Sequence, residues 1–343
     1  MPNAYISGTG FHVPPRVVTN EDLVSEYGID TTNEWIVQRT GIEARRFAAE
    51  GVGTADVALP AAKAAIESAG IAANDLDMIV FCTLSPDYAF PGSGVMLQEK
   101  LGLTEGENPK FVACLDVRNQ CSGFLYGLSV ATAMVRCGSA KHVLLVGAEI
   151  QSPAIDLTSR GRAVSSIFGD GAGAVIVSAT DEDRGVREWA LGADGRFADA
   201  LHQKVWDTSK RPFIPVDDEG NGKLPPETMF TTMEGRLVFK HAVKRMQEVL
   251  HQVCKKHEVA VTDLDLVFFH QANMRINQLV GKQLGLPEEK TPHNVHKYGN
   301  TTAATIPILL AEADREGKLK PGMKIGLVAF GSGFTWGAAI LDW

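Results

Sequence analysis

Cys121 is the residue whose position most clearly suggests chemistry, because it lies where a predicted strand turns into a predicted helix. Phe111 to Val117 is an apolar, β-branched run typical of a strand, and Leu125 to Val135 repeats apolar residues at helical spacing. At a helix N-terminus the macrodipole and the free backbone N–H groups favour a thiolate, so we expect a pKa below ~8.5. The same N–H groups can hold the oxyanion formed when the thiolate attacks a thioester. A lone cysteine is also commonly a buried structural residue, and the rest of the chain decides between these interpretations.

Three further motifs with polar or glycine-rich cores lie in the second half of the chain. They are His270-Gln271-Ala272-Asn273-Met274-Arg275, Tyr298-Gly299-Asn300-Thr301-Thr302-Ala303-Ala304 and Gly331-Ser332-Gly333-Phe334-Thr335-Trp336-Gly337. Taken alone, a histidine at a strand end is more often a satisfied core residue than a catalytic one. Together with Cys121 and Asn300, His270 becomes a candidate for catalysis.

An internal repeat indicates how the chain positions these residues. The buried strand predicted at Asp75–Phe81 recurs 188 residues later at Asp263–Phe269, and the glycine-rich stretch from Phe168 recurs 162 residues later from Phe330. Each half alternates predicted strands and helices, which indicates βαβ units in a mostly parallel sheet with helices on its faces. We therefore expect two similar halves, residues 1–182 and 183–343, related by a pseudo-twofold axis.

The repeat also predicts which residues meet. Cys121 with its following helix corresponds roughly to Asn300 with its own, so the pseudo-symmetry is expected to bring the two helix N-termini together. His270 follows the repeated strand directly and should reach the same edge of the sheet.

Composition narrows the class of protein. The 343 residues are 45% hydrophobic and 22% charged, as in soluble globular proteins, and the apolar runs are shorter than the ~18 residues of a membrane span. A net charge of −8 disfavours nucleic-acid binding. The five cysteines form no C-x-x-C pair, and the N-terminus lacks the pattern of an export signal. We expect a cytoplasmic protein with no metal site.

Trp35 and Arg39 lie four residues apart on a predicted helix, hence on one face of it. They are either a core tryptophan beside a solvated arginine or a flat platform for a purine and its phosphates.

The four motifs, in this order and spacing, resemble the 3-oxoacyl-ACP synthase III family of the thiolase fold. The likeness runs nearly the whole length, from Thr32-Asn33-Glu34-Trp35-Ile36-Val37-Gln38-Arg39-Thr40-Gly41-Ile42 to the last glycine-rich strand. It implies an α/β fold with duplicated βαβαβ halves in a five-layer α-β-α-β-α sandwich.

The resemblance also implies a reaction and its residues. Cys121 would take an acyl group from acyl-CoA, with the oxyanion held by its own N–H and that of Ser332 or Gly333. Malonyl-ACP would then lose CO2, and His270 and Asn300 would stabilise the enolate before the Claisen condensation. A neutral histidine and an asparagine suit this role, since both donate a hydrogen bond without a charge that would protonate the carbanion. No cofactor is implied, because CoA and ACP thioesters are the substrates.

The remaining binding residues are also implied only by the resemblance. The matched positions are Trp35, Arg39 and either Arg160 or Arg162 for CoA, Met233, Gly235 and Asn273 for pantetheine, Lys240 and Arg275 for docking of the carrier protein, and Phe90 for the partner subunit's acyl pocket in a homodimer.

Two features depart from the family pattern and leave the acyl donor open. Arg118-Asn119-Gln120 precedes the nucleophile where small residues are usual, and the segment from Arg196 to Phe230 is long, with Trp206, Lys210-Arg211, Pro212, Pro215 and Pro225-Pro226. We expect that segment to be a stiffened flap at the tunnel entrance.

Alternative functions remain. One is a specialised ketosynthase III-like enzyme or the head-to-head condensation of two acyl chains, although Phe90 stands where head-to-head enzymes typically place a glutamate. Others are a non-catalytic partner of a ketosynthase and a cysteine hydrolase of the protease kind.

Overall fold

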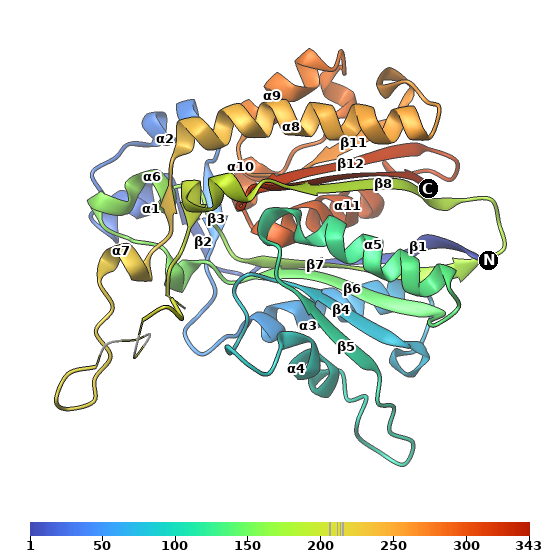
Figure 1. Ribbon diagram of the computed structural model, residues 1–343, viewed down its shortest axis with the longest axis horizontal. Coiled ribbons are helices and arrows are strands. Elements are labelled where there is room, and N and C mark those ends of the chain that lie inside the picture. The colour runs from blue at the N-terminus through green and yellow to red at the C-terminus, as the bar shows by residue number, and fades with distance from the viewer. Residues whose placement is uncertain (206, 211, 213, 215) are drawn as a thin grey trace.

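The computed structural model describes residues 1–205, 207–210, 212, 214 and 216–343, so Trp206, Arg211 and Pro215 of the predicted flap lie outside the described residues. Two sheets lie face to face with helices between them and on both outer faces (Figure 1). This is the five-layer α-β-α-β-α arrangement that the resemblance implied.

The first sheet is built from the first half of the chain. Its strand order is β1-β7-β6-β4-β5, with β1 antiparallel to β7, β7 antiparallel to β6, and β4 parallel to both of its neighbours. The bounds are β1 Asn3–His12, β4 Met78–Cys82, β5 Ala113–Val117, β6 His142–Glu149 and β7 Gly171–Thr180. The strand predicted from Asp75 begins three residues later, because Ala73–Asp75 forms a 3-10 turn.

The second sheet repeats this order without a counterpart of β5. Among the described residues its order is β11-β12-β13-β8, with β11 parallel to β12 and β13 antiparallel to both β12 and β8. The bounds are β8 Gly185–Ala193, β11 Leu266–Phe269, β12 Lys324–Gly331 and β13 Thr335–Asp342. The chain changes sheet between Thr180 and Gly185, beside the predicted boundary at residue 182.

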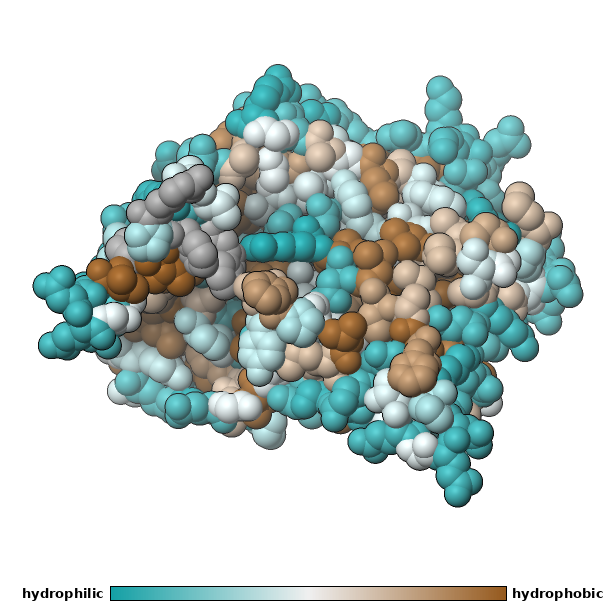
Figure 2. All heavy atoms as spheres, turned by 60° about the horizontal axis from the view of Figure 1, so that its bottom comes forward, coloured by the Kyte–Doolittle hydropathy of each residue, from teal (hydrophilic) through white to brown (hydrophobic). Residues whose placement is uncertain are grey.

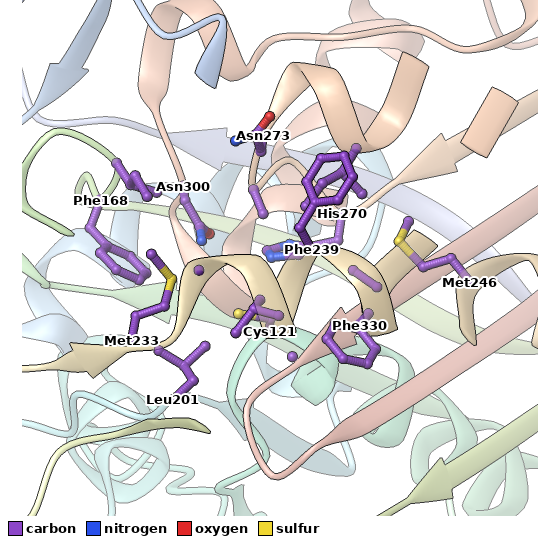
Figure 3. Close-up of a pocket in the computed structure, with 17 residues that line it drawn as sticks. Cys121, Phe168, Leu201, Met233, Phe239, Met246, His270, Asn273, Asn300 and Phe330 are labelled. Carbon is purple, nitrogen blue, oxygen red and sulfur yellow. The ribbon is translucent and has the colours of Figure 1, made fainter. Parts of the chain in front are cut away.

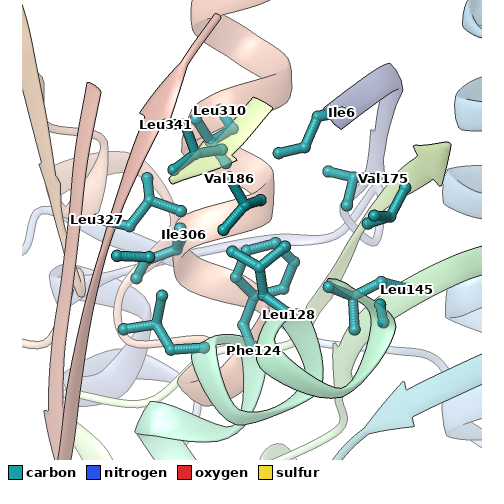
Figure 4. Packing of buried hydrophobic residues seen from close by; sticks show 14 of the residues in the cluster. Ile6, Phe124, Leu128, Leu145, Val175, Val186, Ile306, Leu310, Leu327 and Leu341 are labelled. Carbon is teal, nitrogen blue, oxygen red and sulfur yellow. The ribbon is translucent and has the colours of Figure 1, made fainter. Parts of the chain in front are cut away.

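Two helices, α5 Gly123–Arg136 and α11 Thr305–Arg315, fill the layer between the sheets (Figure 1). Figure 4 shows Phe124 and Leu128 of α5 beside Ile306 of α11, with Leu145 of β6 and Leu327 of β12 on the flanking sheets. Both helices are apolar on more than one side because each is covered by two sheets. Burial of this central layer holds both helices in place, with Cys121 in the turn before α5 and Asn300 shortly before α11.

The outer layers contain α3 Thr54–Ser68 and α4 Ser93–Lys100 on the first sheet, and α8 Gly235–Lys256 and α9 Met274–Gln283 on the second. The smaller elements are β2 Val17–Thr19, α1 Asn20–Ser25, α2 Asn33–Thr40, β3 Ala44–Arg46, α6 Arg162–Ser165, β9 Leu201–His202, α7 Pro226–Met229, β10 Thr232–Met233 and α10 Val295–Tyr298. Thr19 and Thr32 cap α1 and α2, because their side chains accept hydrogen bonds from the N–H groups of Asp22 and Trp35. No helix in the described part of the chain combines the length and hydropathy of a membrane span.

The two central helices begin with matching turns. Gln120–Ser122 precedes α5 and Thr302–Ala304 precedes α11, each as one 3-10 turn whose first residue has a positive φ, 49° at Gln120 and 52° at Thr302. This match pairs Cys121 with Ala303. The predicted correspondence of Cys121 with Asn300 is therefore wrong by three residues, although Asn300 does lie at the start of the second turn.

Candidate active site

Cys121 lies in the turn that joins β5 to α5 and is 7% exposed. Gly331, at the end of β12, packs directly against it, and a Cβ atom at that position would lie 2.8 Å from the Cβ of Cys121. Glycine is required here because the backbone of the second sheet must pass this close to the nucleophile. The turn is further fixed by Ser122, whose hydroxyl lies 2.7 Å from that of Thr335.

The thiol of Cys121 is neutral in the resting site. Burial, followed by the negative charge of Glu149, raises the pKa of this thiol to about 12. The backbone N–H groups of Cys121 and Ser332 and the side-chain amide of Asn300 favour the thiolate, but they do not outweigh the first two effects. The sequence-based expectation of a lowered pKa was therefore wrong.

His270 follows β11, as predicted, and is 3% exposed. Its Nδ1 lies 2.6 Å from the hydroxyl of Thr305, whereas its Nε2 is buried without a partner among the described residues. Burial lowers the pKa of His270 to about 3, so the ring is neutral at physiological pH. The arrangement presents one free ring nitrogen of a neutral imidazole.

Asn300 is held by the first half of the chain. Its backbone N–H donates to the carbonyl of Ile167 at 2.9 Å, and its own carbonyl accepts from the N–H of Gly169 at 3.1 Å. The Oδ1 of Asn300 accepts from the N–H of Thr302 at 2.8 Å, which leaves the amide Nδ2 available to the sulfur of Cys121. Asn300 can therefore act as a donor without reorienting.

These three side chains line one apolar cavity of about 130 Å³. Figure 3 shows His270 and Asn300 pointing toward Cys121. The residues predicted to contact pantetheine, Met233, Gly235 and Asn273, line the same cavity, and Phe239, Met246 and Phe330 are among its other apolar lining residues. The structure thus brings together the predicted trio and the three residues beside it, drawn from both halves.

A second cavity, of about 300 Å³, meets the first at Cys121. About a third of its described lining residues come from the long segment predicted as a flap, which contributes Ala198, Leu201, His202, Gln203 and Val205. Within the described residues, β9 of this segment pairs with β10 and so holds the flap against the cavity. Ser332 and Gly333 close this cavity beside the nucleophile, and the N–H that faces the sulfur belongs to Ser332.

Trp35 and Arg39 form the predicted platform on α2. The guanidinium of Arg39 lies 4.3 Å from the centre of the Trp35 ring, and that of Arg162 lies 5.3 Å from it. The amide of Asn273 donates to the carbonyl of Arg39 at 3.0 Å, which links the platform to the first cavity. Arg160 instead pairs with Asp156 at 2.7 Å, so the geometry favours Arg162 as the arginine of the platform.

The other predicted residues lie on the surface. Lys240 on α8 and Arg275 on α9 are exposed, and Arg275 donates to the carbonyl of Gln38 at 3.5 Å. Phe90 is 85% exposed and lines neither cavity of its own chain. Its predicted role requires a partner subunit and stays a prediction.

Sequence reasoning missed Thr305 and Glu149. Thr305 directly follows the motif Tyr298 to Ala304, at the first position of α11, and a hydroxyl there is a recognisable signal for a partner of His270. Glu149 ends β6 and is fully buried, and it accepts bonds from the Ser85 hydroxyl and the Ala303 N–H. Burial raises the pKa of Glu149 to about 7. The described residues contain no group of histidine, cysteine and acidic side chains that could hold a metal ion.

Comparisons with known proteins place these features in context. The family model described as 3-oxoacyl-[acyl-carrier-protein (ACP)] synthase III matches residues 115–195, and the model of its C-terminal part matches residues 254–343. The chain is 42% identical over 342 residues to β-ketoacyl-[acyl-carrier-protein] synthase III of Bacillus pumilus, with 99% of each chain covered. The corresponding protein of Thiobacillus denitrificans is 41% identical over 336 residues, with 98% of each covered. The crystal structure of 3-oxoacyl-[acyl-carrier-protein] synthase III from Aquifex aeolicus matches with a TM-score of 0.86 and 38% identity, covering 99% of this chain and all of that one.

Proposed function

Because the chain belongs to the 3-oxoacyl-[acyl-carrier-protein] synthase III family, we propose that Cys121, His270 and Asn300 carry out the condensation of that family in it. The protein is a condensing acyltransferase that joins an acyl group from acyl-CoA to malonyl-ACP, with release of CoA and CO2. One observation carries the residue assignment: the three side chains come from both halves of the chain and line one cavity.

In the first half-reaction the sulfur of Cys121 attacks the thioester carbonyl of acyl-CoA. The carbonyl oxygen becomes an oxyanion, and the N–H groups of Cys121 and Ser332, which already face the sulfur, stabilise it. The C–S bond to CoA then breaks, and the thiol proton leaves with the CoA sulfur. Because the resting thiol is neutral, thiolate formation is coupled to substrate binding and does not precede it.

In the second half-reaction malonyl-ACP binds in the first cavity. The Nε2 of His270 and the Nδ2 of Asn300 donate to the malonyl thioester oxygen, so the electrons released with CO2 collect as an enolate. The enolate carbon attacks the acyl group on Cys121, and the sulfur leaves. The low pKa of His270 keeps the ring from protonating the carbanion.

Donation from Nε2 requires a particular tautomer of His270. The hydroxyl of Thr305 lies 2.6 Å from Nδ1 and 3.1 Å from the carbonyl of Thr302, and it has one proton to donate. Donation to Nδ1, the shorter contact, leaves the ring proton on Nε2. Thr305 thus positions His270 and sets its tautomer.

The route to the site begins at the Trp35 platform. Its indole and the guanidinium groups of Arg39 and Arg162 suit an adenine ring and phosphates, and Asn273 connects them to the apolar cavity that takes the pantetheine arm. Exposed Lys240 and Arg275 then dock the acidic carrier protein at the mouth of the cavity. No cofactor is needed, because every step uses a thioester substrate and side chains of the protein.

We propose a homodimer formed through β5. This strand is an edge of the first sheet, and its Leu115 is 39% exposed. Phe111, two residues before the strand, is 79% exposed, and Tyr88 and Phe90 are exposed as well. Figure 2 turns this side of the molecule forward and shows apolar side chains gathered among polar ones. An unpaired apolar edge strand is a site for pairing with a second copy. In such a dimer Phe90 enters the acyl pocket of the partner. The cytoplasmic location inferred from the sequence stays a prediction.

The test is acyl loading followed by condensation. Intact-mass spectrometry of the protein mixed with acyl-CoA should show one added acyl group, located on Cys121, and Cys121→Ala and Cys121→Ser should not acquire it. Addition of malonyl-ACP should then release the label as 3-oxoacyl-ACP. Acylation of Cys121→Ala at another residue would refute the assignment of the nucleophile.

A further inference from the structure

The second cavity beside Cys121 is more polar than the first. Of its fifteen lining residues, eight have polar side chains, whereas three of the seventeen residues of the first cavity are histidine or asparagine and the rest are apolar residues, glycine and Cys121. The eight are Arg118, Gln120, Gln151, His202, Gln203, Thr231, Thr302 and Ser332. Gln151, His202, Gln203 and Ser332 already form hydrogen bonds within the protein. The buried hydroxyl of Thr302 has no partner among the described residues, and an unbranched hydrocarbon chain would leave it unsatisfied, at a cost in free energy.

The charged side chain among the described residues that line the second cavity is a cation. Among the described residues that line it, Arg118 alone carries a fixed charge, and none is an aspartate or a glutamate. In the described part of the chain no carboxylate lies within ion-pair distance of the Arg118 guanidinium, although the protein as a whole has a net charge of −8. A guanidinium that lacks a carboxylate partner and faces a cavity is suited to bind a carboxylate from a ligand through paired hydrogen bonds.

The position of Arg118 in the chain sets where such a ligand carboxylate lies. Arg118 precedes the nucleophile by three residues, so their Cα atoms are at most about 11 Å apart. The acyl group is attached to the sulfur of Cys121, which lines the same cavity. A carboxylate near Arg118 is therefore the far end of a short acyl chain, because the other end is fixed at Cys121.

The geometry points to an acyl donor that is the CoA monothioester of a short dicarboxylic acid. This inference rests on the proposed function and names its substrate class. In the loading step the Sγ of Cys121 forms a bond to the thioester carbon, the C–S bond to CoA breaks, and the thiol proton leaves with CoA. The terminal carboxylate takes no part in bond making and pairs with Arg118.

The test compares acyl donors matched in length. Initial rates of acyl loading at limiting donor are measured by intact mass with succinyl-CoA and butyryl-CoA, and again with glutaryl-CoA and pentanoyl-CoA. The diacid member of each pair should load faster by about tenfold or more, the value of one charge-assisted hydrogen bond. Arg118→Gln should lower this ratio by a similar factor, and Arg118→Lys should retain part of it.

Lys204→Gln is the matched control. This lysine adjoins Gln203 in the flap, pairs with Asp199 at 3.3 Å and does not line the cavity, so its loss removes the same charge from the same region. The ratio of diacid to neutral loading should remain that of the unchanged protein. A ratio that falls equally in both variants would show a general effect of charge on the anionic donor and would overturn the inference.

Failure of this inference can be told apart from failure of the proposed function. Loading of butyryl-CoA on Cys121 without faster loading of succinyl-CoA would overturn the dicarboxylate inference and leave the condensing function intact. An unchanged ratio in Arg118→Gln, with thermal unfolding as in the unchanged protein, would also overturn it. No loading of any acyl-CoA on Cys121 would refute the proposed function and this inference with it.

Discussion

Replacing Gly331 with alanine tests whether the close approach of β12 positions the nucleophile. The added Cβ would lie 2.8 Å from the Cβ of Cys121 and 3.1 Å from its backbone nitrogen. Two carbon atoms pack at about 3.5–4.0 Å, so β12 and the Cys121 turn must separate by about 1 Å. The backbone of Gly331 is not left-handed, so alanine adds steric bulk alone.

This separation should lower both the stability of the folded protein and the rate of acyl loading. Overpacking of this kind costs about 1–3 kcal/mol. It moves Cys121 away from the N–H of Ser332, and a misplacement of ~1 Å in a reacting group can lower a rate by about 100-fold. We expect Gly331→Ala to load acyl groups about 10- to 100-fold more slowly than the unchanged protein.

Gly123→Ala is the control for this experiment. Gly123 is the first residue of α5, and a Cβ there would lie 3.5 Å from the nearest atom, which is ordinary packing. Rates of loading for both variants are measured by intact mass at a fixed acyl-CoA concentration, with thermal unfolding as a check on folding. Equal loading by Gly331→Ala and the unchanged protein would refute the argument that this contact positions the sulfur.

Other predictions follow from the same geometry. His270→Ala and Asn300→Ala should still load acyl groups, but release of CO2 from malonyl-ACP should fall by about 10²–10³-fold for each, and an equal loss of loading would contradict their separate role. Because the pKa of Cys121 is raised to about 12, iodoacetamide should alkylate it about tenfold faster per pH unit from pH 7 to 10, and a plateau near pH 8.5 would contradict this. Decarboxylation by the loaded enzyme should show no ionisation of His270 between pH 5 and 8, because its pKa lies at about 3. Carrier-protein affinity should fall with added salt and with Arg275→Glu, and a salt-independent affinity would remove the electrostatic argument.

The convergence of Cys121, His270 and Asn300 on one cavity and the duplicated order of strands could be predicted from the sequence, because both depend on local patterns, whereas the catalytic roles of these residues stay a prediction. Turns from a strand into a helix, glycine-rich turns and repeated apolar strands can each be recognised within a short stretch of sequence. The predicted alignment of the two halves, which paired Cys121 with Asn300, was wrong by three residues. The apolar pattern of a sequence locates the ends of helices only to within a few residues.

The pKa of Cys121 could not be predicted from its own stretch of chain. Its sign depends on burial by the second sheet and on Glu149, which lies 28 residues away and reaches the site only through the fold. The sequence likewise left open whether Arg160 or Arg162 contacts CoA. The structure favours Arg162, because Arg160 forms an ion pair with Asp156. The polar cavity combines Arg118 with residues of the flap, and no local pattern connects these two segments.

The matching turns before α5 and α11 limit how many acyl groups one chain can hold. Each helix N-terminus offers free N–H groups to an anion, but in the turn before α11 the N–H of Ala303 already donates to the carboxyl of Glu149 at 3.4 Å. The second turn also carries alanine where the first carries cysteine. Of these two turns, the first alone combines a thiol with N–H groups that no carboxyl faces, so we expect one acyl group per chain.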